Sequence, residues 1–171
     1  MRRRQFILTW IILLVVQMFL CNYFQFTPIV TLSILPAMIL CLPLSVGTVP
    51  ALFIAFGAGF TVDFLADGVI GLNVFALVAV AALRRPILRL VFGTELFSRG
   101  EDITIRRNGL LPVSIAIVFA ELVFFILYTI ADGAGTRTFL FNFGRVMLST
   151  LTSFILCLVA ADTLLGENNR L

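Results

Sequence analysis

The chain has 171 residues, of which 61% are hydrophobic and 12% charged, whereas soluble domains average roughly 45–50% apolar residues. This composition excludes an ordinary soluble domain and indicates an all-α, polytopic integral membrane protein that is embedded in membrane lipid. The net charge of +3 comes from twelve arginines, without lysine or histidine. Because these arginines do not gather into one basic stripe, we expect no nucleic-acid partner.

Six apolar segments are long enough to cross a membrane, because a helix rising about 1.5 Å per residue needs about 20 residues to span it. We predict six transmembrane helices at about 6–24, 28–45, 47–66, 70–92, 110–131 and 141–165. They leave too few residues for a soluble domain, so we expect a single transmembrane domain over 1–171.

The first span follows Met1-Arg-Arg-Arg-Gln-Phe6, which has the charge of a signal-peptide start. The apolar run is too long for a signal peptide and no small-x-small site ends it, so we expect an uncleaved helix. The second and third spans are divided only by Leu42-Pro-Leu-Ser-Val-Gly47. Its proline and glycine predict a tight hairpin.

Arginine placement predicts the orientation, because positive loops stay on the cytoplasmic side. With six crossings, ten of the twelve arginines lie on the side of the N-terminus, and only Arg137 and Arg145 lie on the other. We therefore expect both termini to be cytoplasmic, in a multi-pass protein of a bacterial inner membrane.

Two rows of small residues at helical spacing predict close helix packing. One row, in the third span, leads to Asp63 and Asp67; the other, in the sixth, begins at Arg145. Their members are Gly47, Ala51, Ala55 and Gly59, and Ser149, Ser153, Cys157 and Ala161. A sharper hypothesis places the two rows face to face, with Asp63 paired to Arg145. In the alternative, Asp63 caps the turn at Ala66-Asp67-Gly68 while Arg145 reaches the membrane surface alone.

Glu121 lies near the middle of the fifth span. A carboxyl group at that depth must be protonated, paired, or turned toward a polar interior. A proton relay needs a chain of such groups, and Glu121 is the one at that depth, so structural use is the main expectation.

The residue inventory argues against an enzyme. The sequence has no histidine, which excludes a Ser-His triad and a zinc-protease helix. Its three cysteines (Cys21, Cys41 and Cys157) lie in apolar spans without metal-ligand spacing. Asp63 and Asp67 come from one helix, whereas an intramembrane aspartyl dyad uses two. We expect no catalytic residues, no cofactor and no metal.

The stretch Gly57-Ala-Gly59-Phe-Thr-Val-Asp63-Phe-Leu-Ala-Asp67-Gly68-Val-Ile-Gly71-Leu-Asn73 resembles the signature of the rod shape-determining protein MreD family. In that family a glycine-rich helix ends in an aspartate, passes through a glycine-containing turn and enters the next helix. The similarity is specific over residues 57–76 and general elsewhere. Together with the charged residues within the other spans, these motif residues are our structural or partner-interaction candidates: Gly59, Asp63, Asp67, Gly68, Gly71, Asn73, Glu121 and Arg145.

The resemblance implies a scaffold for cell shape and peptidoglycan synthesis. In the elongation complex, MreD proteins are membrane partners of MreC, which connects them to MreB filaments and to the peptidoglycan polymerase and transpeptidase. The family's fold is similar to the S components of energy-coupling-factor vitamin transporters, and such a substrate-binding component is our alternative. S components usually dock through an Ala-x-x-x-Ala face of the first helix, but residues 6–20 contain neither alanine nor glycine.

Overall fold

The computed structural model describes residues 2–23, 30–93, 103, 105–133 and 138–166, and every regular element among them is helical. The elements are α1 (Arg2–Tyr23), α2 (Leu35–Leu40), α3 (Thr48–Val62), η1 (Asp63–Asp67), α4 (Leu72–Phe92), α6 (Ile105–Asn108), α7 (Leu110–Gly133) and α8 (Phe139–Gly166). The all-helical prediction is therefore confirmed for the described residues.

Among the described residues, four helices are long and apolar enough to cross a membrane. They cover Arg4–Tyr23, Thr48–Ala66, Leu110–Gly133 and Phe139–Leu165 and coincide with the first, third, fifth and sixth expected spans. The fourth expected span forms α4, whose 21 residues include Arg84, Arg85 and Arg89 toward its end. These three charges set α4 apart from the four apolar helices.

The segment expected to form the second span is not one continuous helix. In place of a helix over 28–45, residues 30–34 form no regular secondary structure and α2 has only 6 residues. Pro36 lies in the first turn of α2, where its missing N–H removes no helical hydrogen bond. Pro43 follows the end of the helix, and a proline disfavours helical geometry in the residue before it. The two prolines thus confine the helix to a single short stretch.

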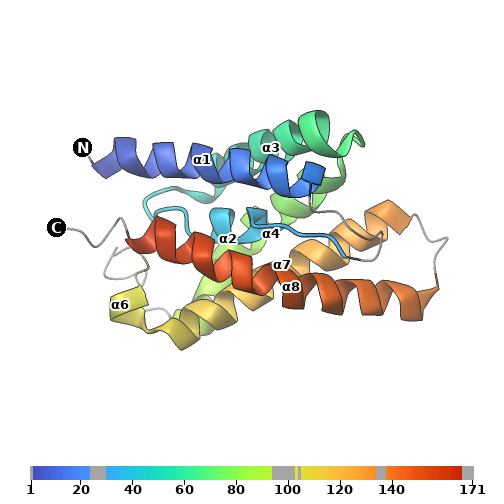
Figure 1. Ribbon diagram of the computed structural model, residues 1–171. Coiled ribbons are helices and arrows are strands. Elements are labelled where there is room, and N and C mark those ends of the chain that lie inside the picture. Colours follow the sequence, from blue (N-terminus) through green and yellow to red (C-terminus); the bar gives the residue numbers. More distant parts are fainter. Residues whose placement is uncertain (1, 24–29, 94–102, 104, 134–137, 167–171) are drawn as a thin grey trace.

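The short helix α2 forms the centre of the bundle (Figure 1). All six of its residues are buried, and it packs against α4, α7 and α8. Helix α1 lies at the periphery, with contacts to η1, α8, α2 and α3. The beginning of α1 and the end of α8 lie at the same end of the bundle.

The outward-facing side chains are largely apolar. On α1 they include Ile7, Leu8, Ile12 and Phe19, and on α8 they include Leu151, Ile155 and Val159, each roughly half exposed or more. Water-soluble proteins rarely expose such continuous apolar surface, whereas the hydrocarbon of a membrane favours it. The surface and the four apolar helices therefore indicate a membrane protein.

The small residues of α3 pack against α4, not against α8. A Cβ atom added at Gly59 would lie 2.7 Å from the Cα and 2.8 Å from the backbone nitrogen of Val74 in α4. Helix α8 instead packs mainly against α7 and α2. Close packing along the α3 row is thus observed, but the hypothesis that the two rows face each other is wrong.

We predict that Gly59→Ala lowers the free energy of unfolding by about 1–3 kcal/mol, because the added methyl group must displace the α4 backbone. Gly57→Ala is the matched control on the same helix, since its Cβ would meet nothing within 4 Å. The control should be neutral or stabilising by up to about 1 kcal/mol. Denaturing-detergent titrations followed by circular dichroism measure both. Equal effects of the two substitutions would contradict the close approach.

Candidate functional site

A glycine-containing turn joins α3 to α4. The chain widens into the single π-helical turn η1, then bends at Gly68 (φ 71°) and Gly71 (φ 109°) before α4 begins. Residues with a Cβ atom rarely adopt these left-handed angles. Gly68 and Gly71 are therefore required by the geometry of the turn.

Asp63 is fully buried and accepts four hydrogen bonds at the start of α4. Its Oδ1 accepts the backbone N–H and the side-chain amide of Asn73, both over 2.9 Å. Its Oδ2 accepts the N–H groups of Gly71 (2.8 Å) and Val74 (3.2 Å). The first N–H groups of a helix lack partners within it, and Gly71 at the N-cap has no side chain to supply one. Asp63 therefore caps α4 from the preceding helix, with its charge at the positive end of the α4 dipole.

The expected pair between Asp63 and Arg145 is wrong. Arg145 pairs instead with Asp132 of α7. The alternative, in which Asp63 caps the following turn, describes the structure better: the Asp63 carbonyl accepts the N–H of Gly68 over 2.9 Å, and its side chain reaches on to α4. Rows of small residues indicate that a helix face packs closely, but they do not determine which helix lies against that face.

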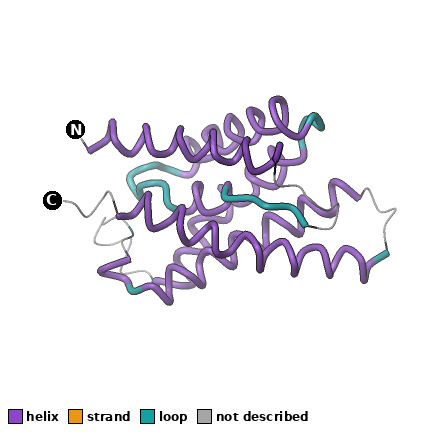
Figure 2. Tube along the Cα trace, in the orientation of Figure 1, coloured by secondary structure: helices purple, strands orange, loops and turns teal. Residues whose placement is uncertain are grey.

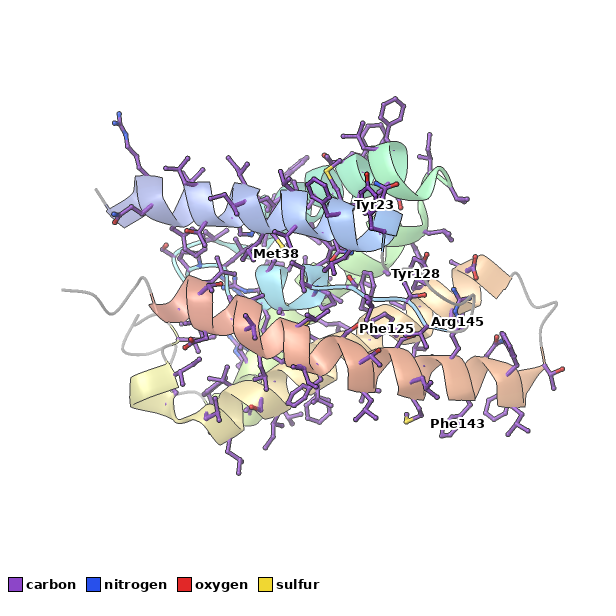
Figure 3. All side chains as sticks on the ribbon, viewed as in Figure 1. Tyr23, Met38, Phe125, Tyr128, Phe143 and Arg145 are labelled. Carbon is purple, nitrogen blue, oxygen red and sulfur yellow. The ribbon has the colours of Figure 1, made fainter. Side chains whose placement is uncertain are left out.

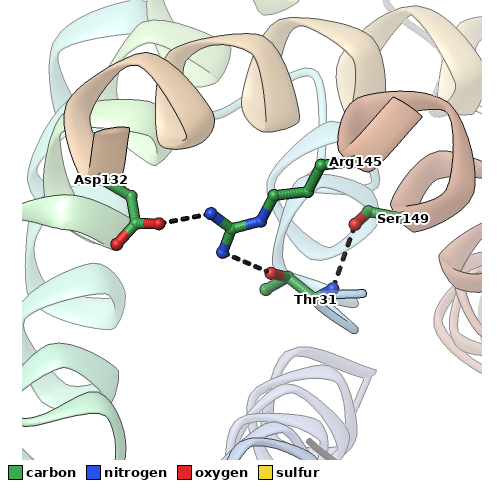
Figure 4. Close-up of polar contacts among 4 residues, drawn as sticks. All are labelled: Thr31, Asp132, Arg145 and Ser149. Atoms are coloured by element: carbon green, nitrogen blue, oxygen red, sulfur yellow. Dashed lines mark hydrogen bonds and ion pairs between the residues drawn. The ribbon is translucent and has the colours of Figure 1, made fainter. Parts of the chain in front are cut away.

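Arg145 connects three parts of the chain (Figure 4). Its guanidinium group pairs with Asp132, donates to the Thr31 hydroxyl over 3.2 Å and lies over the Tyr128 ring, 5.8 Å from the ring centroid. Figure 3 shows Tyr128 and Arg145 close together, with Phe143 pointing away on the other side of α8. Arg145 is thus a buried cross-link and does not reach the surface alone.

The extended segment 30–34 passes through the interior of the bundle (Figure 2), and α8 supplies most of its hydrogen bonds. The N–H of Thr31 donates to Ser149 Oγ over 3.0 Å, and the N–H of Ser33 donates to Ser153 Oγ over 3.1 Å. Ser153 donates in turn to the Thr31 carbonyl (3.4 Å), and the Cys157 thiol donates to the Ser33 carbonyl (3.3 Å). The small-residue row of α8 is therefore a polar ladder for this segment.

Gln17 of α1 binds the same segment from the other side. Its Oε1 accepts the N–H of Ile34 over 2.7 Å, and its Nε2 donates to the Leu32 carbonyl over 3.2 Å. The side-chain amide of Gln17 thus supplies both the acceptor and the donor that a neighbouring strand would otherwise provide. Unpaired backbone groups are costly in hydrocarbon, so Gln17 and the α8 ladder together allow a non-helical segment to exist there.

Arg84 of α4 plays the corresponding role at the other end of α2. Its side chain is buried, and Nε donates to the Leu40 carbonyl over 3.2 Å. The remaining nitrogens donate to the carbonyls of Leu42, Pro43 and Val46. The last carbonyls of a helix lack intrahelical partners and form its negative end. Arg84 thus caps α2 inside the bundle.

Glu121 is completely buried in the middle of α7. Apart from the Cys157 thiol, its carboxyl oxygens have no hydrogen-bond partner among the described residues. The Cys157 thiol of α8 lies beside it, but that thiol donates to Ser33. Glu121 is therefore a polar group whose role the surrounding hydrogen bonds do not explain.

The structure brings together most of the candidates from the motif. Gly59, Asp63, Gly68, Gly71 and Asn73 all belong to the α3–α4 connection, whereas Glu121 and Arg145 lie elsewhere in the bundle. The side chain of Asp67 lies outside the described residues.

Gln17, Arg84 and Asp132 bind other groups of the bundle but were not among the expected candidates. Gln17 carried a usable signal, because it is an amide within an otherwise apolar first span. Among the described residues, no group of three or more histidine, cysteine or acidic side chains could hold a metal ion. The polar side chains of the interior mainly bind backbone groups and so fix the segments of the chain relative to one another. No protein-family model, curated protein or solved structure matches this chain.

We predict that Asp63→Asn destabilises the protein by about 1–3 kcal/mol, because the amide NH2 places donors against the N–H groups at the start of α4. Asp162→Asn is the control, since Asp162 is exposed near the end of α8; it should change stability by less than about 0.5 kcal/mol. Detergent-induced unfolding measures both variants. Unchanged stability of Asp63→Asn would refute the capping role.

We predict that Ser153→Ala exposes segment 30–34 to local opening, because the N–H of Ser33 and the carbonyl of Thr31 lose their partner. The expected cost is about 1–3 kcal/mol. Hydrogen–deuterium exchange of peptides covering 30–34 should become faster by about 10-fold or more, since 1.4 kcal/mol corresponds to a factor of 10. Thr152→Ala is the neighbouring control, because Thr152 is exposed and bonds only to carbonyls of its own helix. Similar exchange in both variants would argue against the ladder.

Proposed function

We propose that this chain is a non-enzymatic scaffold of the bacterial cell-elongation machinery, related to MreD and working with MreC in the inner membrane. The observation that carries the proposal is the closed unit at residues 57–76, the stretch with the specific resemblance. In it, Gly59 lies against Val74, Gly68 and Gly71 make the turn, and Asp63 binds the start of α4. The motif residues thus contact one another and fix the turn between α3 and α4 as a rigid corner.

A fixed corner suits a scaffold better than a catalyst. Several polar side chains of the interior bind backbone groups and are therefore occupied by structural hydrogen bonds. They are Asp63, Arg84, Gln17 and Ser153. The outer faces of α1 and α3 carry large apolar side chains. Within the membrane such faces can meet lipid or the transmembrane segment of a partner such as MreC.

The proposed topology has six crossings with both termini in the cytoplasm. The start of α1 and the end of α8 lie at the same end of the bundle (Figure 1). This placement supports an even number of crossings. In this arrangement the arginine-rich end of α4 faces the cytoplasm, on the side of the MreB filaments. The peptidoglycan polymerase and transpeptidase would be reached through MreC.

An S component of a vitamin transporter is the second candidate, and the interior discontinuity at 30–46 favours it. Transporters often build their binding sites from interrupted helices, whose free backbone groups contact the substrate. Here the backbone groups of the extended segment are bound by Gln17, Ser149 and Ser153 instead. Helix α1 also lacks alanine and glycine over residues 6–20. Both points favour the scaffold.

Depletion of the protein in its host distinguishes the two candidates. We expect rod-shaped cells to widen or round, and wild-type protein or the control Gly57→Ala to restore the rods. Affinity purification of the tagged chain from native membranes should recover MreC. Depleted cells that keep a normal shape but require a vitamin would favour the S component over the scaffold. Normal shape, no vitamin requirement and no MreC would reject both.

A further inference from the structure

The buried carboxyl group of Glu121 has no role in the corner or in the proposed scaffold. Its exposure is 0%, in the middle of a 24-residue apolar helix. Helix α7 packs against α4, α8 and α2, so the group points into protein on all sides. Apart from the Cys157 thiol, both oxygens lack a donor among the described residues. A charged carboxylate in that environment is strongly disfavoured unless it is paired.

The groups around Glu121 offer it no positive charge in the part of the chain that is described. From α8 the titratable neighbour is Cys157, and Cys41, which ends α2, lies within electrostatic reach of Cys157. From α4 the buried cation is Arg84, which interacts with Cys41 and donates to carbonyls of residues 40–46. Glu121 thus faces a thiol and not an ion-pair partner.

The hydrogen bonds of Cys157 favour the neutral form of Glu121. A thiol has one S–H, and Cys157 donates it to the Ser33 carbonyl over 3.3 Å. No donor then remains for a carboxylate at Glu121. A neutral carboxyl group carries its own O–H and can donate it to the sulfur, which completes a chain from Glu121 through Cys157 to Ser33.

We propose that Glu121 is a proton-binding site and that Cys157 transmits its occupancy to the extended segment 30–34. When water takes the proton, the O–H bond breaks and the electron pair stays on the carboxylate. The carboxylate then needs a donor, and the S–H of Cys157 is the one beside it. Turning the thiol toward Glu121 leaves the Ser33 carbonyl without its partner and loosens the segment.

Infrared spectroscopy of the full chain in lipid vesicles tests both halves of the proposal. At pH 7 the wild type should show the C=O stretching band of a protonated carboxylic acid, and Glu121→Gln should lose it. The control Asp162→Asn, at an exposed carboxyl group, should keep it. If Glu121→Gln does not assemble, Glu121→Asp retains the acid and should shift the band. Identical wild-type and Glu121→Gln spectra in this region would overturn the proposal.

The coupling is tested by raising the pH of the same vesicles. Loss of the carboxylic-acid band should coincide with a shift of the S–H stretching band that Cys157→Ala removes, and with faster hydrogen exchange in peptides covering 30–34. In Glu121→Gln, whose amide mimics the neutral acid as a donor, neither signal should respond to pH. If the acid band disappears while the S–H band and the exchange stay constant, transmission through Cys157 is wrong.

Discussion

Backbone N–H and C=O groups inside a membrane have no water to bind, so each must find a partner within the protein. A helix meets this requirement by itself, but the extended segment 30–34 does not. Its partners come from side chains of α1 and α8: Gln17, Ser149, Ser153 and Cys157. Because α2 continues this segment and packs against α4, α7 and α8, the arrangement of the whole bundle depends on these few hydrogen bonds.

The same requirement explains why polar residues occur in so apolar a chain. Asp63 binds the free N–H groups at the start of α4, and Arg84 binds the free carbonyls beyond α2. Each charge therefore meets the end of a helix dipole that attracts it. Glu121 differs because its oxygens meet no such group among the described residues. Unlike Asp63 and Arg84, Glu121 therefore has a role that hydrogen bonding to the backbone does not explain.

Much of the fold follows from composition and apolar length, which predicted the helical class and the positions of four helices that are long and apolar enough to span a membrane. The short α2 could not be predicted in this way, because residues 28–45 are as apolar as a spanning helix and only Pro36 and Pro43 mark the break. The glycines of the turn were identified correctly from their pattern. The partner of Asp63 was not, since spacing along α3 and α8 gives depth, whereas pairing depends on which helices are neighbours. The role of Arg84 could not be predicted either, because the sequence gives no sign of the carbonyls around it.

The hydrogen bonds of segment 30–34 also bear on the order in which the protein is made. Thr31 and Ser33 precede their α8 partners by 118 and 120 positions in the chain, and synthesis proceeds from the N-terminus. Until α8 has emerged from the ribosome, the segment has no stable place in hydrocarbon. Its other side-chain partner, Gln17, lies in α1 and is made before the segment itself. A chain that stops before residue 149 therefore lacks the α8 side chains that bind Thr31 and Ser33.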